Sequence, residues 1–146
     1  MQSIKKALLF GFLIWLIPFV VSFPIFSLRE TNRALFESIM PVTLSIVVVI
    51  FVCQYFKRLE KNYLKESIIL SILWYFMPLL IDLAMFFPNS PMHMSFLEYM
   101  SDIGLTYVII PIIIINSGYL MDRKIKQNET ITIEKQELKE DNKESN

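Results

Sequence analysis

Residues 67–87 read SIILSILWYFMPLLIDLAMFF, a run of 21 residues in which the only charged side chain is that of Asp82. A helix needs about 20 mainly apolar residues to cross the hydrocarbon core of a bilayer. Three further runs have this length and composition: residues 7–28 and 103–121 carry no charge, and residues 35–56 carry a single acid. The four runs together predict an all-α fold, a four-helix transmembrane bundle.

The composition of the whole chain averages over two unlike parts. Its 146 residues are 54% hydrophobic and 19% charged, and 14 basic residues balance 14 acidic ones. This length allows one domain, and four apolar runs leave too little polar surface to cover them in a soluble protein. The last 20 residues hold six acids and few large apolar side chains, so they cannot offset the entropy of ordering. We therefore expect a transmembrane domain over residues 1–126 and a charged, disordered tail over residues 127–146.

The distribution of lysine and arginine predicts the orientation. Nine of these residues flank the membrane on the side shared by both termini, and two, Arg29 and Arg33, flank it on the other side. Cytoplasmic segments retain positive charge, so both termini are expected in the cytoplasm, in a multi-pass protein of the cell membrane. The first apolar run is longer than the core of a signal peptide and lacks a small-residue cleavage site, which favours an uncleaved helix.

The two halves of the transmembrane domain share a pattern. Lys5 precedes Pro18 by 13 residues, and Lys65 precedes Pro78 by 13 residues. Each half runs outward and back, so the pattern predicts two parallel hairpin repeats. The alternative is chance similarity, because apolar helices resemble one another in composition.

Asp82 is the leading candidate for a functional site. An acid in the middle of a spanning helix costs about 2.5–3.5 kcal/mol on the insertion scale, and less near the interface. Asp82 lies five residues before the end of its run, so it should face the bundle or a wet vestibule. Glu37 lies at a similar depth from the outer side, Arg33 precedes Glu37 by four residues, and Asp102 lies at the same surface. These four residues predict an outer polar cluster. It is either a binding site for a cation, a proton or a polar solute, or a structural network in which arginine is the partner.

The sequence contains no catalytic motif. One histidine cannot provide a bis-histidine haem site, one cysteine excludes an internal disulfide, and three glycines form no phosphate-binding loop. Met92 and Met94 flank His93, and thioethers select Cu(I), although methionine also fills packing gaps. We predict no enzymatic activity, no cofactor and no metal site.

Three segments resemble an uncharacterised family of small prokaryotic four-span membrane proteins. They are residues 10–18 (FGFLIWLIP), residues 35–41 (LFESIMP) and residues 94–111 (MSFLEYMSDIGLTYVIIP). The resemblance covers residues 5–121. It implies a helical membrane fold, and it assigns no activity and no site residue.

The sequence favours a small transporter, a channel-like protein or a solute-binding membrane protein built on the outer polar cluster. The competing hypothesis is a non-catalytic accessory or structural subunit that packs against other membrane proteins. A ligand or a file of water beside Asp82 would support transport, whereas a dry Asp82 salt-bridged to an arginine, with an apolar external face, would support the accessory role. The expected partners are the lipid bilayer and either a second copy or another membrane protein, with no nucleic acid.

Overall fold

The computed structural model describes residues 4–59, 62–86 and 95–144, except for the side chains of Arg29, Glu30, Phe86, Glu98, Asp102 and residues 140–144. Within these ranges the chain is helical and contains no strand. The long helices are α1 (Ile4–Thr31), α2 (Arg33–Phe56), α3 (Tyr63–Phe86) and α5 (Ile109–Glu144). A short helix, α4 (Phe96–Asp102), and a 3-10 segment, η1 (Gly104–Val108), lead into α5.

Four helical stretches are long and apolar enough to cross a membrane, which confirms the four predicted spans. They are Ile4–Leu28, Arg33–Phe56, Tyr63–Met85 and Gly104–Lys139. By length and composition these helices make the chain a multi-pass membrane protein with an all-α fold. Residue 87, the expected end of the third span, lies outside the described residues.

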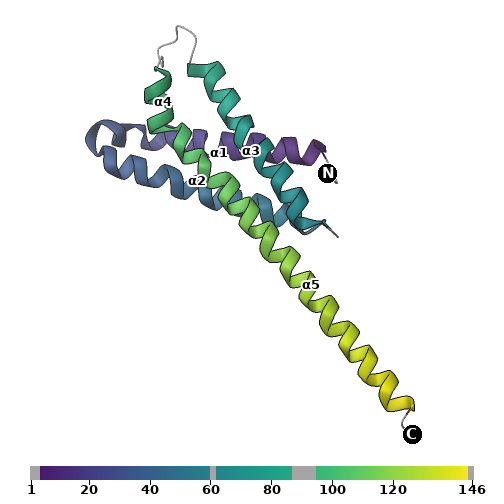
Figure 1. Cartoon of the computed structure of the whole chain (residues 1–146). Helices are drawn as coiled ribbons and strands as arrows, with labels where there is room; N and C mark the ends of the chain where they lie inside the picture. The colour runs from purple at the N-terminus through teal and green to yellow at the C-terminus, as the bar shows by residue number, and fades with distance from the viewer. Residues whose placement is uncertain (1–3, 60–61, 87–94, 145–146) are drawn as a thin grey trace.

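The helices form two hairpins that cross each other (Figure 1). α1 and α2 make the first hairpin and α3 and α5 the second, and the hairpins meet where α1 packs on α3 and α2 packs on α5. Hydrogen bonds join Trp74 to Ala7 and Trp15 to Asp82, and the partners are 67 residues apart in both pairs. Equal separations mean that α1 and α3 run parallel, as two successive out-and-back hairpins require.

Asn32 alone separates α1 from α2. Its side-chain Oδ1 accepts a hydrogen bond from the Leu35 N–H at 3.2 Å, which caps the first turn of α2. Its own N–H donates to the Leu28 carbonyl at 2.7 Å. The connection expected between the first two spans is therefore helical except at this residue.

The core lies between the four long helices. Its fully buried apolar side chains include Ile14 of α1, Val48 of α2, Leu70 and Trp74 of α3, and Ile110 and Ile114 of α5. Gly118 marks a close approach between α3 and α5, because an added Cβ there would overlap the hydroxyl of buried Ser67. Small residues let helix backbones approach closely in membranes, where lipid is as apolar as leucine. Gly118 and Ser67 therefore set the spacing of the second hairpin.

α5 continues beyond the bundle and projects away from the other helices (Figure 1). The predicted disordered tail is helical as far as Glu144. The reason is that the spanning part of α5 supplies the helical nucleus, after which each added residue gains one backbone hydrogen bond. The side chains of residues 127–139 are all exposed, so this extension buries no apolar face, in agreement with its composition.

Candidate functional site

Asp82 lies near the C-terminal end of α3, and only 4% of its surface is exposed. The indole Nε1–H of Trp15 donates to Oδ1 at 2.6 Å. The hydroxyls of Tyr107 and Tyr99 donate to Oδ2 at 2.6 Å and 3.2 Å. Each carboxylate oxygen therefore has a partner, and one side chain joins α1, α3, α4 and η1. We call these four residues the Asp82 network.

Local structure places the three donors. Trp15 stacks on Phe19, one turn further along α1, with ring centroids 4.9 Å apart, which orients its indole. Tyr99 in α4 and Tyr107 in η1 lie on either side of Ile103, where the backbone departs from helical geometry with φ −121°. The bend at Ile103 lets both hydroxyls reach the same carboxylate oxygen.

The donors of the Asp82 network carry no formal charge. In the part of the chain that the structure describes, neither lysine nor arginine contacts Asp82. Hydrogen bonds to a charged group contribute about 1.5–3 kcal/mol each in soluble proteins, and they offset the cost of burying a carboxylate. Burial and the adjacent carboxylate raise the pKa of the Tyr99 hydroxyl, so this group stays protonated and remains a donor.

Arg33 and Glu37 form a separate pair on α2. Their Nε and Oε1 atoms lie 2.5 Å apart, and the two side chains are 63% and 53% exposed. Their spacing of four residues predicted this contact. The structure joins them to each other and not to Asp82, whose partners come from α1, α4 and η1. An exposed pair of this kind on a helix contributes about 0.3–0.5 kcal/mol, so it adds little to the stability of the fold.

Asp102 is the last residue of α4, and its side chain lies outside the described part of the chain. Met92, His93 and Met94 also lie outside it. Among the His, Cys, Asp and Glu side chains that are described, no group of three or more is placed to hold a metal ion. Of the four residues expected in the outer cluster, Arg33 and Glu37 are brought together, and Asp82 has other partners.

No sequence pattern assigned Trp15, Tyr99 or Tyr107 to Asp82. A signal was nevertheless present, because an indole N–H or a phenol inside a membrane requires an acceptor, and Asp82 is the single acid of the apolar run over residues 67–87. Trp74 obeys the same rule, since its Nε1–H donates to the carbonyl of Ala7 at 2.8 Å. The two tryptophans thus donate in opposite directions between α1 and α3.

Comparison of the chain with protein-family models, with curated proteins and with solved structures gave no match. The resemblance to small four-span membrane proteins therefore stays a prediction, and the function has to be argued from the geometry of this chain.

Proposed function

We propose that this chain is an accessory or structural subunit of the cell membrane, with both termini in the cytoplasm, that packs against other membrane proteins. The observation that carries the proposal is the occupation of both Asp82 oxygens by donors from the same chain. A cation or solute site must offer ligand atoms to its occupant. Only 4% of the surface of Asp82 is exposed, so a cation or solute reaches the carboxylate only after one of its three donors has moved, and the carboxylate serves to hold four elements together.

The outer surfaces of the helices are compatible with the same proposal. Each spanning helix exposes large apolar side chains, for example Phe12 of α1, Ile46 of α2, Ile72 of α3 and Ile112 of α5. Such faces pack equally well against lipid or against the apolar helices of another chain. The surface of this protein is therefore suited to association within the bilayer.

Flux measurements on reconstituted protein test the proposal. The purified full chain is placed in liposomes, and proton and potassium fluxes are compared for wild type, Asp82→Asn and Glu37→Gln. We expect all three to match protein-free vesicles, while Asp82→Asn alone lowers the thermal stability. A flux in the wild type that Asp82→Asn abolishes, in a protein that is still folded, would contradict the accessory role.

Transport through the Asp82 network is the second candidate function. It is favoured by the position of the carboxylate within a span, where ionisable groups commonly mark ion or proton pathways, and by two hydroxyl donors that can rotate away. In this mechanism Tyr99 and Tyr107 release Oδ2 to a proton or cation. Tyr107→Phe would then change the flux, whereas under the accessory role it changes only the stability.

A further inference from the structure

The end of α2, the start of α3 and the point where α5 leaves the other helices lie at one end of the bundle (Figure 1). Five basic residues flank the helices there, and we call them the basic cluster: Lys57, Arg58, Lys65, Arg123 and Lys124. All five side chains are exposed, and each lies one to three residues outside the apolar runs over residues 35–56, 67–87 and 103–121. Lipid headgroups begin where the hydrocarbon core ends, so the basic cluster lies at the level of the headgroups.

Buried aromatic residues join the end of α2 to the start of α3. The rings of Phe56 and Tyr63 meet edge to face with their centroids 5.6 Å apart, and both side chains are buried. Lys57 directly follows Phe56, and Lys65 lies two residues after Tyr63. The packing of these two rings therefore holds the cations of α2 and α3 at the same end of the bundle.

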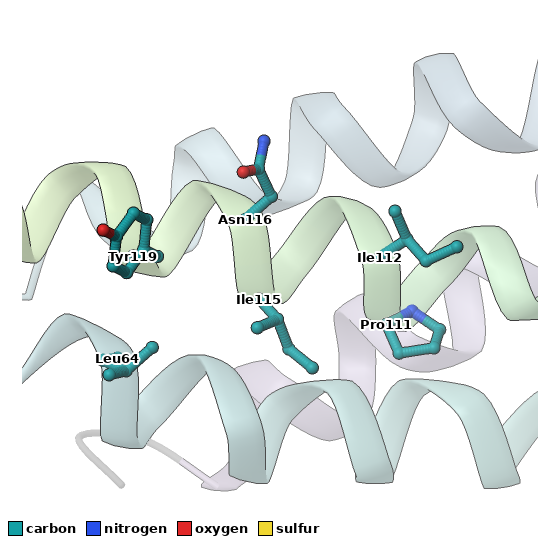
Figure 2. Close-up of a pocket in the computed structure, with 6 residues that line it drawn as sticks. All are labelled: Leu64, Pro111, Ile112, Ile115, Asn116 and Tyr119. Carbon is teal, nitrogen blue, oxygen red and sulfur yellow. The ribbon is translucent and has the colours of Figure 1, made fainter.

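The first turn of α3 also packs against α5. Leu64 of α3 and Tyr119 of α5 line one shallow groove, and Figure 2 shows these two side chains opposite each other. Lys65 directly follows Leu64. Arg123 follows Tyr119 by four residues, so the two side chains lie on the same face of α5. The cations of α5 therefore lie close to the cation of α3.

The described acids beside the basic cluster are bonded to other groups. Glu66 accepts a hydrogen bond from the hydroxyl of Tyr55 at 3.2 Å, and Asp122 pairs with Lys126 at 3.2 Å. Within the part of the chain that the structure describes, which leaves out residues 60 and 61, none of the five cations forms an ion pair. Like charges held at one end of the bundle repel one another, and an anion from outside the chain would relieve this repulsion.

We propose that the basic cluster binds the headgroup of an anionic phospholipid. Phosphate oxygens accept paired hydrogen bonds from a guanidinium and single ones from an ammonium. Clusters of about four to eight Lys and Arg residues beside a spanning helix attract anionic lipids, and the bilayer supplies these phosphates at the level of the cluster. A zwitterionic lipid carries no net charge to balance the five cations. The inference goes beyond the accessory function proposed above and does not depend on it.

Native mass spectrometry of the full chain, released from detergent micelles, tests the inference. Phosphatidylglycerol and phosphatidylcholine with identical acyl chains are titrated in turn, so that only the headgroup differs. We expect phosphatidylglycerol to bind more tightly, and its affinity to fall as the salt concentration rises, because salt screens exposed charges. Equal affinity for the two lipids, or an affinity for phosphatidylglycerol that salt does not change, would overturn the inference.

Two pairs of lysine and arginine residues on α5 provide matched variants. One cation near an anionic surface corresponds to about a fivefold change in affinity. Arg123→Gln with Lys124→Gln should therefore weaken phosphatidylglycerol binding about 25-fold, and Lys65→Gln about fivefold. Lys135→Gln with Lys139→Gln removes the same charge from exposed positions and should match wild type, because Lys135 lies about 16 Å further along the helix, beyond the screening length of about 8 Å. An equal loss in both double variants would overturn the inference.

Two further measurements identify the role of charge and the source of the phosphate. Arg123→Lys with Lys124→Arg keeps both charges and should retain the preference for phosphatidylglycerol, and loss of the preference would contradict a charge-based site. Inorganic phosphate, compared with chloride at equal ionic strength, should not displace the lipid. Complete displacement would indicate a site for free phosphate and would overturn the lipid as occupant. Circular dichroism of the glutamine variants shows that they are folded before their affinities are compared.

Discussion

Replacement of Asp82 removes the acceptor of three donors at once. In Asp82→Leu the Trp15 N–H and the hydroxyls of Tyr99 and Tyr107 all lose the acceptor that they share. In Asp82→Asn one oxygen remains for Trp15, and the new amide can donate to a tyrosine oxygen. The two variants therefore separate the loss of the network from the loss of its charge.

The expected destabilisation follows from the three hydrogen bonds. Interhelical hydrogen bonds in membrane proteins contribute about 0.6 kcal/mol on average and about 1.7 kcal/mol at most. Three such bonds give about 2–5 kcal/mol, and the bonds from Trp15 and Tyr107 are short at 2.6 Å. Asp82→Leu also removes the unfavourable burial of a carboxylate, which offsets part of the lost hydrogen-bond free energy. We expect about 2–4 kcal/mol of lost unfolding free energy for Asp82→Leu and about 1 kcal/mol for Asp82→Asn.

Two measurements check this prediction. Titration with a denaturing detergent in mixed micelles, followed by circular dichroism, gives the unfolding free energy. The chain has two tryptophans, so the indole N–H spectrum by ¹⁵N NMR contains two signals. Asp82→Asn should move the Trp15 signal and leave that of Trp74, which bonds to a backbone carbonyl.

Glu37→Gln is the matched control for this prediction. It replaces an exposed carboxylate with an amide, so both the unfolding free energy and the indole signals should stay within error of wild type. The reasoning would be refuted by an Asp82→Leu variant as stable as wild type, or by a Trp15 signal that does not move in Asp82→Asn.

Three further predictions concern the packing of α3 and the exposed end of α5. Gly118→Ala should cost about 1–3 kcal/mol of unfolding free energy, because its Cβ overlaps Ser67, and the double variant with Ser67→Gly should recover part of the loss in the same detergent titration. Trp74→Phe removes the hydrogen bond to Ala7 and should cost about 1 kcal/mol beyond the lost ring volume, with the Trp15 signal unmoved. Deletion of residues 128–146 removes a segment whose described side chains are exposed, so the unfolding free energy of the bundle should not change, and a large loss would show that the extension packs on it.

The spans were predictable from the sequence because the requirement is local. A run of about 20 apolar residues is long enough to cross the bilayer wherever its neighbours lie, and all four runs recur as helices. The contact between Arg33 and Glu37 was predictable for a similar reason, since residues four apart share a helix face. The helical connection at Asn32 was harder to predict from the sequence, because the length of an apolar run does not show whether the helix continues through the charged residues that follow it.

The partners of Asp82 could not be predicted in the same way. Its donors lie 67, 25 and 17 residues away along the chain, in Trp15, Tyr107 and Tyr99. Charge alone favoured an arginine as the partner, since opposite charges attract over long distances. The packing of α1 on α3 and the bend at Ile103 instead brought uncharged donors to the carboxylate.

The sequence by itself determined that this chain crosses the membrane in four helices and that one acid is buried within it. Both follow from solvation. A run of about 20 apolar residues is more stable in hydrocarbon than in water, and an acid within such a run must turn away from the lipid because its transfer to hydrocarbon is unfavourable. The tertiary structure alone decided what the acid does, since its role depends on which donors the crossing of two hairpins places within hydrogen-bonding distance.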